Sequence, residues 1–261
     1  MQLELSGKTA IVTGASRGIG LATVQALRAE GVRVVGAARK PTPELEETGA
    51  YAVPVDLGTR DGAQHLVDEA VRVYGGVDLL VNNLGGGDRL NLAGFADLDD
   101  DAWADAFDIN LFATVRVTRA ALPWLVAGGG GAVVNVSSIG AWRPEGPPLA
   151  YNVAKAALKA FGRGLATELG PSGVRVVTVS PGPTRTAMWE GDSGLGAQLA
   201  TALGAPQEMI VAGAPDQMGM VTGRMAEPAE VADLISYLLS PRAANITGSD
   251  HLIDGGAIRT A

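Results

Sequence analysis

A tyrosine and a lysine stand four residues apart in the stretch YNVAK, at Tyr151 and Lys155. Side chains at positions i and i+4 share one face of a helix, with Cβ atoms about 5 to 6 Å apart. A phenol would then lie beside a fixed positive charge, which is the arrangement that lowers the pKa of a weak acid. The alternative is that Tyr151 packs as an aromatic side chain while Lys155 points into water. Other motifs of the chain decide between the two interpretations.

A glycine-rich stretch, TGASRGIG, runs from Thr13 to Gly20 between the first predicted strand and the first predicted helix. Glycines at such a turn let the backbone approach a pyrophosphate, which the N–H groups and the dipole of the following helix stabilise. Their positions, Gly14, Gly18 and Gly20, differ from the more common G-x-G-x-x-G spacing. The place of this turn in the chain nevertheless predicts dinucleotide binding.

Short runs of β-branched residues alternate with helix-length segments along the chain. We expect strands at residues 8–13, 32–38, 51–56, 77–83, 132–138, 174–180 and 250–254. The clearest helical patterns cover residues 20–31, 61–75, 99–126, 149–170 and 227–240. This alternation predicts an α/β fold with a doubly wound, parallel, seven-stranded sheet and helices on both faces. Ligands of such sheets bind outside the carboxyl ends of the strands, where all the motifs of this chain fall.

A single domain at residues 1–261 is expected, because a chain with 47% hydrophobic residues and neither repeat nor linker can bury one substantial core. Residues 183–226 interrupt the alternation, since they mix glycine, methionine, proline and isolated apolar residues without clear periodicity. A long structureless loop inside a domain usually serves a function. We therefore expect this segment to be a lid over the substrate.

The composition argues against several classes of site and partner. The chain contains no cysteine and only two histidines, so we expect no disulfide and no metal centre. Its amino-terminal apolar run is too short for a signal peptide or a membrane span, which predicts a soluble, cytoplasmic protein. A formal net charge of -8, without any run of lysine or arginine, argues against nucleic acid or a membrane surface as partner.

Further motifs follow the predicted strands in a fixed order: NNLG at residues 82–85, two serines at 137–138 and PGPTRT at 181–186, with Asn110 in the long helix. Together with TGASRGIG and YNVAK, they resemble the short-chain dehydrogenase/reductase superfamily over nearly the whole chain. The resemblance implies a Rossmann fold and an oxidoreductase that uses a nicotinamide dinucleotide.

The resemblance also implies a role for four residues. Tyr151 would be the acid or base at the substrate oxygen, and Ser138 would hydrogen-bond that oxygen. Asn110 would help hold a water that links Lys155 to solvent, and Lys155 would also bond the nicotinamide ribose. A phenol has an ordinary pKa near 10, so ionisation near neutrality needs a cation, either Lys155 or the oxidised nicotinamide. Ser137 is the alternative serine, but Ser138 has the family's spacing from the tyrosine and would face the other side of the strand.

The end of the second predicted strand, GAARK, bears on the choice of cofactor. An acidic residue there would accept a hydrogen bond from the adenosine ribose of NAD, yet Ala38 occupies the position. Arg39 and Lys40 follow, and Arg17 in the glycine-rich turn would add a positive charge. Guanidinium groups suit a 2′-phosphate, so we expect NADP(H) to be preferred over NAD(H), unless these residues form only a solvated loop.

By the same resemblance, the dinucleotide lies along the carboxyl ends of the strands. Asp56 would contact the adenine, or would serve only as a surface cap. Leu84 stands where the family usually has alanine and would narrow the cofactor wall, while the run Gly85 to Gly87 would open space beside the nicotinamide. The expected cofactor contacts are Gly14, Ser16, Arg17, Gly18, Ile19, Gly20, Arg39, Lys40, Asp56, Leu57, Asn83, Gly85, Tyr151, Lys155, Pro181, Gly182, Thr184 and Thr186.

The leading hypothesis is an NADP(H)-dependent oxidoreductase that interconverts a ketone and a secondary alcohol on a small, fairly apolar molecule. Apolar side chains of the predicted lid and of the loop after Ser138 are the candidate pocket lining, although such residues more often serve packing. They are Trp142, Met188, Trp189, Leu195, Leu199, Met209, Ile210 and Met218.

Two alternatives remain open. One is a 3-oxoacyl thioester reductase acting on acyl carrier protein or coenzyme A, although the stretches LVAGGGGAVV and GPSG lack the basic residues that an acidic carrier needs. The other is a catalytically silent, dinucleotide-binding regulator, a class that commonly lacks the tyrosine and lysine. A homo-oligomer, tetramer or dimer, is also expected, because the family commonly pairs the helix at 149–170. Small residues on that helix are Ala154, Ala157, Ala160 and Gly164.

Overall fold

The computed structural model describes residues 2–86 and 90–259, and its seven strands form one parallel sheet in the order β3-β2-β1-β4-β5-β6-β7. The strands are β1 (Thr9–Thr13), β2 (Arg33–Ala38), β3 (Tyr51–Pro54), β4 (Leu79–Asn82), β5 (Ala132–Val136), β6 (Arg175–Pro181) and β7 (Asp250–Ile253). Each strand falls on one of the seven runs expected from the sequence, so the prediction of a doubly wound α/β fold is confirmed.

The helices agree with the expected pattern except at three places. The main ones are α1 (Gly18–Ala29), α2 (Pro43–Glu47), α3 (Gly62–Tyr74), α4 (Asp100–Phe107), α5 (Ala113–Ala127), α6 (Leu149–Leu169), α7 (Ala187–Glu190), α8 (Leu195–Leu203), α9 (Gln207–Gln217) and α10 (Pro228–Leu239). Short turns are η1 (Phe95–Asp97), η2 (Asp108–Phe112), η3 (Ile139–Ala141), η4 (Gly170–Ser172) and η5 (Pro241–Ala243). The long pattern at 99–126 is divided by η2, α2 was not predicted, and residues 183–226 contain helices. No helix in the described part of the chain is both long and apolar enough to cross a bilayer.

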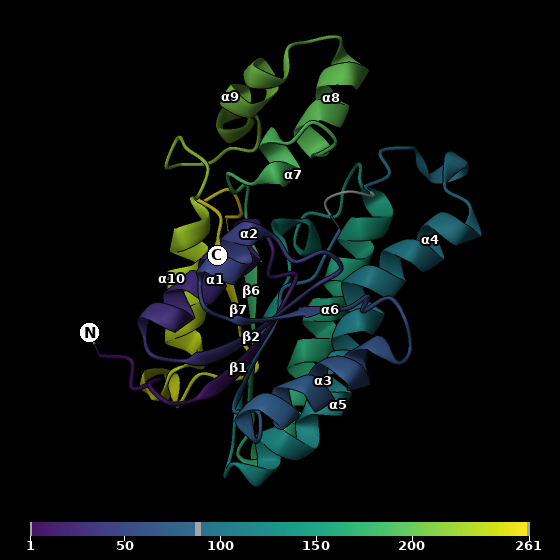
Figure 1. The fold of residues 1–261 in the computed structure, drawn as a ribbon. Helices are drawn as coiled ribbons and strands as arrows, with labels where there is room; N and C mark the ends of the chain where they lie inside the picture. Colours follow the sequence, from purple (N-terminus) through teal and green to yellow (C-terminus); the bar gives the residue numbers. More distant parts are fainter. Residues whose placement is uncertain (1, 87–89, 260–261) are drawn as a thin grey trace.

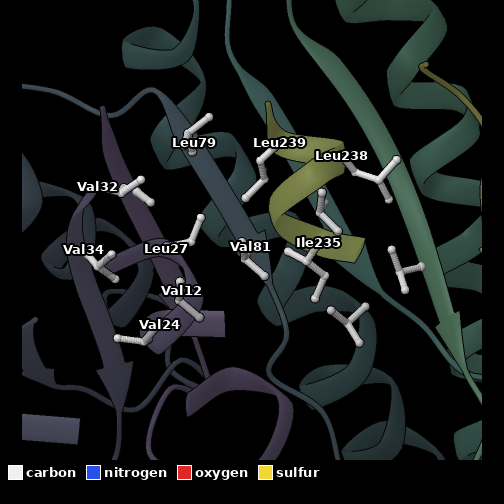
Figure 2. Close-up of a cluster of buried hydrophobic side chains, with 14 of the residues drawn as sticks. Val12, Val24, Leu27, Val32, Val34, Leu79, Val81, Ile235, Leu238 and Leu239 are labelled. Atoms are coloured by element: carbon white, nitrogen blue, oxygen red, sulfur yellow. The ribbon is translucent and has the colours of Figure 1, made fainter. Parts of the chain in front are cut away.

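Two apolar layers cover the faces of the sheet. Alternate residues of a strand face opposite sides, so Ala10 and Val12 join one core cluster while Ile11 joins the other. The first cluster packs against α1 and α10, and Figure 2 shows Leu27 and Ile235 among its side chains. The second packs against α3, α5 and α6, and Figure 1 shows the helices on the two sides of the sheet. With both faces covered, a ligand reaches the sheet at the strand ends.

The winding of the sheet reverses between β1 and β4, which lie side by side although β2 and β3 separate them in the chain. Such a switch point opens a crevice at the carboxyl ends of the two strands, where ligands of open α/β sheets bind. The register pairs Val12 with Val81, so the glycine-rich turn and the NNLG stretch follow at the same level. Two of the predicted motifs therefore meet at the crevice.

The segment at residues 183–226 is helical, and the expectation of a structureless loop was wrong. It contains α7, α8 and α9, which Figure 1 shows together beyond the carboxyl ends of the strands. An isolated β-bridge between Thr184 and Ala226 joins the two ends of the segment. Its buried side chains form a separate small core of Trp189, Ala214 and Met225, packed by Met188, Leu195, Leu199, Val211 and Met218. Most of the apolar residues expected to line a pocket therefore pack against one another.

Helix α6 exposes only part of its series of small residues. Ala154 is fully buried inside the chain, and Ala157 is partly buried. Ala160 and Gly164 are exposed. Only the later turns of α6 thus offer small residues to a second helix.

Arg175, at the start of β6, fastens the end of α10 to the sheet. Its guanidinium group donates hydrogen bonds to four carbonyl oxygens at 2.9 to 3.3 Å, those of Leu238, Leu239, Ser240 and Ile246. The last carbonyl groups of a helix have no partner within the helix, so an outside donor must satisfy them. Partial burial of the guanidinium lowers the pKa of Arg175.

Replacing Arg175 should therefore destabilise the protein. We expect Arg175→Met to lower the free energy of unfolding by about 2 to 4 kcal/mol, because several buried carbonyl groups lose a charged donor. Urea denaturation followed by circular dichroism measures the change. Arg163→Met, on the exposed face of α6, is the control and should change stability by less than about 0.5 kcal/mol. Equal stability of the two variants would show that the four hydrogen bonds contribute nothing.

Candidate active site

The glycine-rich turn leaves the amino-terminal end of α1 open. The side chain of the N-cap residue, Arg17, forms no capping hydrogen bond, and the first turn of α1, which the structure describes in full, contains no acidic residue. Gly14 has a φ of 65°, and a Cβ atom at Gly20 would collide with the carbonyl oxygen of Gly14. Glycine is therefore required for the helix to begin this close to the strand. Uncapped N–H groups at the positive end of a helix are the donors that a pyrophosphate needs, so this turn fits a dinucleotide.

Thr13 and Asn83 fasten the turn to the loop that follows β4. The Thr13 hydroxyl accepts hydrogen bonds from the backbone N–H groups of Asn83 and Leu84, both at 3.0 Å. The Asn83 amide donates to the carbonyl oxygens of Thr13 and Gly14 at 3.0 and 3.1 Å. Asn83, expected to contact the cofactor, thus shapes the turn that would hold it. Thr13 was missed, and its signal was a hydroxyl residue directly before the first glycine.

The loop after β2 is joined to the same turn. Ser16 donates from its hydroxyl to the carbonyl oxygen of Lys40 at 3.1 Å, and Thr42 donates to the carbonyl oxygen of Ser16 at 3.0 Å. Thr42 also accepts from the N–H of Leu45 and so caps α2. Arg39 and Lys40 are exposed. The basic residues expected at a 2′-phosphate therefore lie beside the glycine-rich turn.

Three further residues expected to lie at the cofactor differ in exposure. Asp56 is exposed and accepts a hydrogen bond from the N–H of Gly58 at 2.9 Å, so it caps a turn. Leu57 is 3% exposed and belongs to the second core cluster. Leu84 packs against the same cluster. The side chains of Leu57 and Leu84 therefore pack into the second core cluster.

The loop after β6 covers the glycine-rich turn. A Cβ atom at Gly18 would lie 3.1 Å from the methyl group of Thr186. The Thr186 hydroxyl donates to the carbonyl oxygen of the buried Thr184 at 3.3 Å, and the N–H of Gly182 bonds the end of β7 at 3.0 Å. The PGPTRT motif therefore lies across the crevice from the start of α1, as expected.

Lys155 is buried at the end of β5. Lys155 is 2% exposed, and its Nζ donates a hydrogen bond to the carbonyl oxygen of Val136 at 2.8 Å. Burial disfavours the charged ammonium and lowers the pKa of Lys155 to about 8. A Cβ atom at Gly85 would lie only 2.7 Å from this Nζ. The glycine of the NNLG motif therefore makes room for the ammonium group.

Asn110 lies in the π-helical turn η2 and holds the loop after β4. Its Oδ1 accepts a hydrogen bond from the N–H of Gly86 at 3.0 Å, and its Nδ2 donates to the carbonyl oxygen of Ala106 at 2.9 Å. The side chain is thus engaged by the backbone and positions this loop. Single π turns occur often at functional sites. Gly87, the last member of the expected glycine run, lies outside the described residues.

Ser138 and Tyr151 interact through their side chains, and this interaction lowers the pKa of the phenol. The Ser138 hydroxyl also accepts from the N–H of Gly140 at 3.1 Å. Lys155 lies nearby, with its Nζ 5.8 Å from the centroid of the Tyr151 ring. The alternative serine, Ser137, is buried and donates to the carbonyl oxygen of Lys155 at 3.0 Å. The structure therefore brings the chosen serine, the tyrosine and the lysine to one place.

The pKa of Tyr151 is raised above its ordinary value. Burial of the phenol is the larger cause, and the hydrogen bond to Ser138 opposes it by a smaller amount. Lys155 alone therefore does not bring the phenol toward ionisation. The oxidised nicotinamide is left as the other candidate cation.

Known proteins resemble this chain along its length. Residues 14–257 match the family described as enoyl-(acyl carrier protein) reductase. The granaticin polyketide synthase putative ketoacyl reductase 2 from Streptomyces violaceoruber is 37% identical over 253 residues, which cover 95% of either chain. The 3-alpha-(or 20-beta)-hydroxysteroid dehydrogenase of Mycobacterium bovis is 31% identical over 266 residues, 99% of this chain and 92% of that one. L-sorbose reductase from Gluconobacter frateurii, solved with NADPH and L-sorbose, has a TM-score of 0.90 and 33% identity over 100% of both chains.

The burial of Lys155 predicts an unusual titration. In the protein without dinucleotide, its ammonium should lose its proton near pH 8 rather than near its ordinary value of 10.5. The unfolded chain then binds more protons between these two values, so the free energy of unfolding should rise with pH across this window. NMR titration of isotope-labelled lysine side chains measures the pKa, and the signal lost in Lys155→Met identifies the residue. That variant should also lack this part of the pH dependence of stability. Titration of every lysine near pH 10 would contradict the prediction.

Proposed function

Because the chain belongs to the short-chain dehydrogenase/reductase superfamily of oxidoreductases, we propose that it transfers a hydride between NADP(H) and a ketone or secondary alcohol of a small molecule. The observation that carries this proposal is that Ser138, Tyr151 and the buried ammonium of Lys155 come together at one place. A regulator that only binds the dinucleotide has no need for this arrangement.

Each side chain has a distinct part in the proposed reduction. Ser138 donates a hydrogen bond to the carbonyl oxygen, and Tyr151 gives that oxygen a proton as negative charge develops on it. The raised pKa of Tyr151 suits this direction, because the phenol holds its proton until the substrate takes it. Lys155 stabilises the phenolate left behind and bonds the nicotinamide ribose. When bound, the dinucleotide supplies the hydride, or accepts it in the reverse direction.

The predicted cofactor site fits a phosphorylated dinucleotide on chemical grounds. The open end of α1 supplies N–H donors for the pyrophosphate. Arg39 and Lys40 are exposed beside the same turn, and Ala38 leaves no carboxylate to bond the ribose hydroxyl of NAD. The similar L-sorbose reductase was solved with NADPH. These features support a preference for NADP(H).

A second candidate function is the reduction of a 3-oxoacyl thioester, which the similarity to a putative ketoacyl reductase favours. The two functions differ in the carrier of the reacting ketone. Both use the same four side chains, namely those of Asn110, Ser138, Tyr151 and Lys155. NADPH oxidation measured against free ketones and against acyl thioesters separates them.

The segment at residues 183–226 is proposed to act as a lid over the substrate within a single catalytic domain. Its helices pack around their own small core, so they can move as a unit about the bridge between Thr184 and Ala226. A homo-oligomer is proposed as well, with the exposed Ala160 and Gly164 of α6 at the contact. Light scattering that reports a monomer at micromolar concentration would refute the oligomer.

The role of Tyr151 is tested by removing its hydroxyl group. We expect Tyr151→Phe to lower kcat by roughly a hundredfold or more, because a positioned proton donor contributes this much, while the Kd for NADPH changes little. The absorbance of NADPH measured with a panel of ketones follows turnover. Tyr51→Phe is the control, since the Tyr51 hydroxyl bonds Glu69 at 2.7 Å, outside the candidate site. Retention of most of the activity by Tyr151→Phe would refute the assignment.

The preference for NADP(H) is tested at the end of β2. Arg39→Ala should raise the Kd for NADPH by roughly tenfold to a hundredfold, because a charge-assisted hydrogen bond to phosphate is lost, and should leave the Kd for NADH nearly unchanged. Ala38→Asp should also lower the Kd for NADH, because the new carboxylate accepts a hydrogen bond from the ribose hydroxyl. Arg33→Ala, at the opposite end of β2, is the control. Equal binding of NADH and NADPH by the unaltered protein would overturn the proposed preference.

A further inference from the structure

A cavity of about 690 Å³ lies where three segments meet: the loop after Ser138, the end of α9 and the carboxyl-terminal tail. Its lining includes Trp142, Arg143, Asp216, Met218, Ile258 and Arg259. We propose that this cavity receives the part of the substrate remote from the reacting carbonyl group, and that its two guanidinium groups bind a carboxylate or phosphate on that part. The inference rests on the proposed function, and it names a substrate class: ketones with an anionic end.

The location of the cavity supports this use. One wall continues directly from the candidate catalytic serine, because Trp142 and Arg143 both bond the carbonyl oxygen of Ile139, at 2.9 and 3.0 Å, through their N–H groups. The end of α9, which belongs to the proposed lid, forms another part of the lining. A substrate held by Ser138 and covered by the lid would therefore have this space for its distal part.

Trp142 forms a wall that is already fixed without a ligand. Its indole N–H donates to the Asp250 carboxylate at 2.8 Å, and the Lys159 ammonium lies 3.0 Å from the centroid of its ring. Asp250 is held in turn by the Ser180 hydroxyl at 2.8 Å. A preorganised wall reduces the entropy lost on binding. Together with Met218 and the tail, it gives the middle of a substrate an apolar surface.

Arg143 and Arg259 supply the positive charge. Within residues 2–86 and 90–259, neither guanidinium group forms a hydrogen bond or an ion pair. Asp216 also lines the cavity, so two positive charges and one negative charge face it, in a protein with a formal net charge of -8. A planar guanidinium group can bind a carboxylate or a phosphate through two parallel hydrogen bonds. Two such groups, with no partner among the described residues, are therefore ready for an anionic ligand.

The position of Arg259 is set by a buried carboxylate. Asp254 is 6% exposed, and its two oxygens accept hydrogen bonds from the N–H groups of Gly256 and Ile258 at 3.0 and 2.7 Å. These bonds turn the tail after β7 and direct its next residue toward the cavity, whose lining includes both Ile258 and Arg259. The tail therefore contributes to a built site.

The test compares methyl ketones that end in a carboxylate with their methyl esters, over a series of chain lengths. For the chain length that fits, we expect kcat/KM to be at least about tenfold higher for the acid than for the ester, mainly through KM. The double variant Arg143→Gln, Arg259→Gln should lower kcat/KM for the acid to the value measured for the ester, and kcat/KM for the ester should stay the same. Arg163→Gln, on α6 and outside this cavity, should change neither. Added salt should weaken the preference for the acid.

Two results would overturn the inference: equal kcat/KM for acids and esters in the unaltered protein, or an equal effect of the double variant on both. Failure of the proposed function gives a different result, namely no oxidation of NADPH with any ketone. In that case, calorimetric titration of the carboxylate ketones into the protein with NADP shows whether the anion site exists. Binding that the double variant abolishes would support the anion site on a protein that is not a reductase, and absence of binding would refute the site.

Discussion

A buried ammonium group is the feature on which the rest of the candidate site depends. Lys155 is 2% exposed, and its hydrogen-bond acceptor is a neutral group, the carbonyl oxygen of Val136. Within the described ranges, no carboxylate forms an ion pair with it, so its charge is taken from water without a counter-charge. Moving a charge out of water in this way costs several kcal/mol of free energy, and the pKa of Lys155 is lowered because the neutral amine avoids this cost. The fold must therefore supply stability elsewhere and hold α6, the end of β5 and the loop at Gly85 rigidly around the charge.

The rigidity comes from the register of the central strands. Asn82 is paired with Asn135, and Asn135 with Thr178, so three polar side chains form one rung across β4, β5 and β6. The Asn82 amide donates to the Asn135 amide oxygen at 2.9 Å inside the core. A slip of one residue would direct these groups to the opposite face of the sheet, among apolar side chains. The rung therefore fixes the level at which the next residues, Asn83 and Val136, reach the crevice.

Much of this arrangement could be predicted from local sequence, and the missing part depends on contacts between distant segments. The strands were predictable because buried parallel strands are short runs of β-branched residues. The proximity of Tyr151 and Lys155 was predictable because residues four apart lie on the same face of any regular helix. Helices α8 and α9 were missed because a segment rich in alanine and glycine, with few charges, shows no contrast between a polar and an apolar face. The raised pKa of Tyr151 was not predictable, since the burial that raises it depends on packing between elements that are distant in the sequence. Thr13 had a signal, a hydroxyl residue directly before the first glycine, but its partners, the N–H groups of Asn83 and Leu84, belong to a segment distant in the sequence.

The two halves of the site are held to the sheet in different ways. The cofactor half consists of strand ends joined by short hydrogen bonds, such as those between Thr13 and Asn83, so a change there disturbs the whole crevice. The half proposed to cover the substrate is a helical segment with its own core, connected through the bridge at Thr184 and the hydrogen bond from the N–H of Thr222 to the carbonyl oxygen of Gly255 at 3.1 Å. Substitutions in that segment need not alter the core of the sheet, because its buried side chains pack around a separate core. The shared motifs therefore identify the oxidoreductase family, and the proposed substrate class depends on side chains that belong to none of these motifs, such as Trp142.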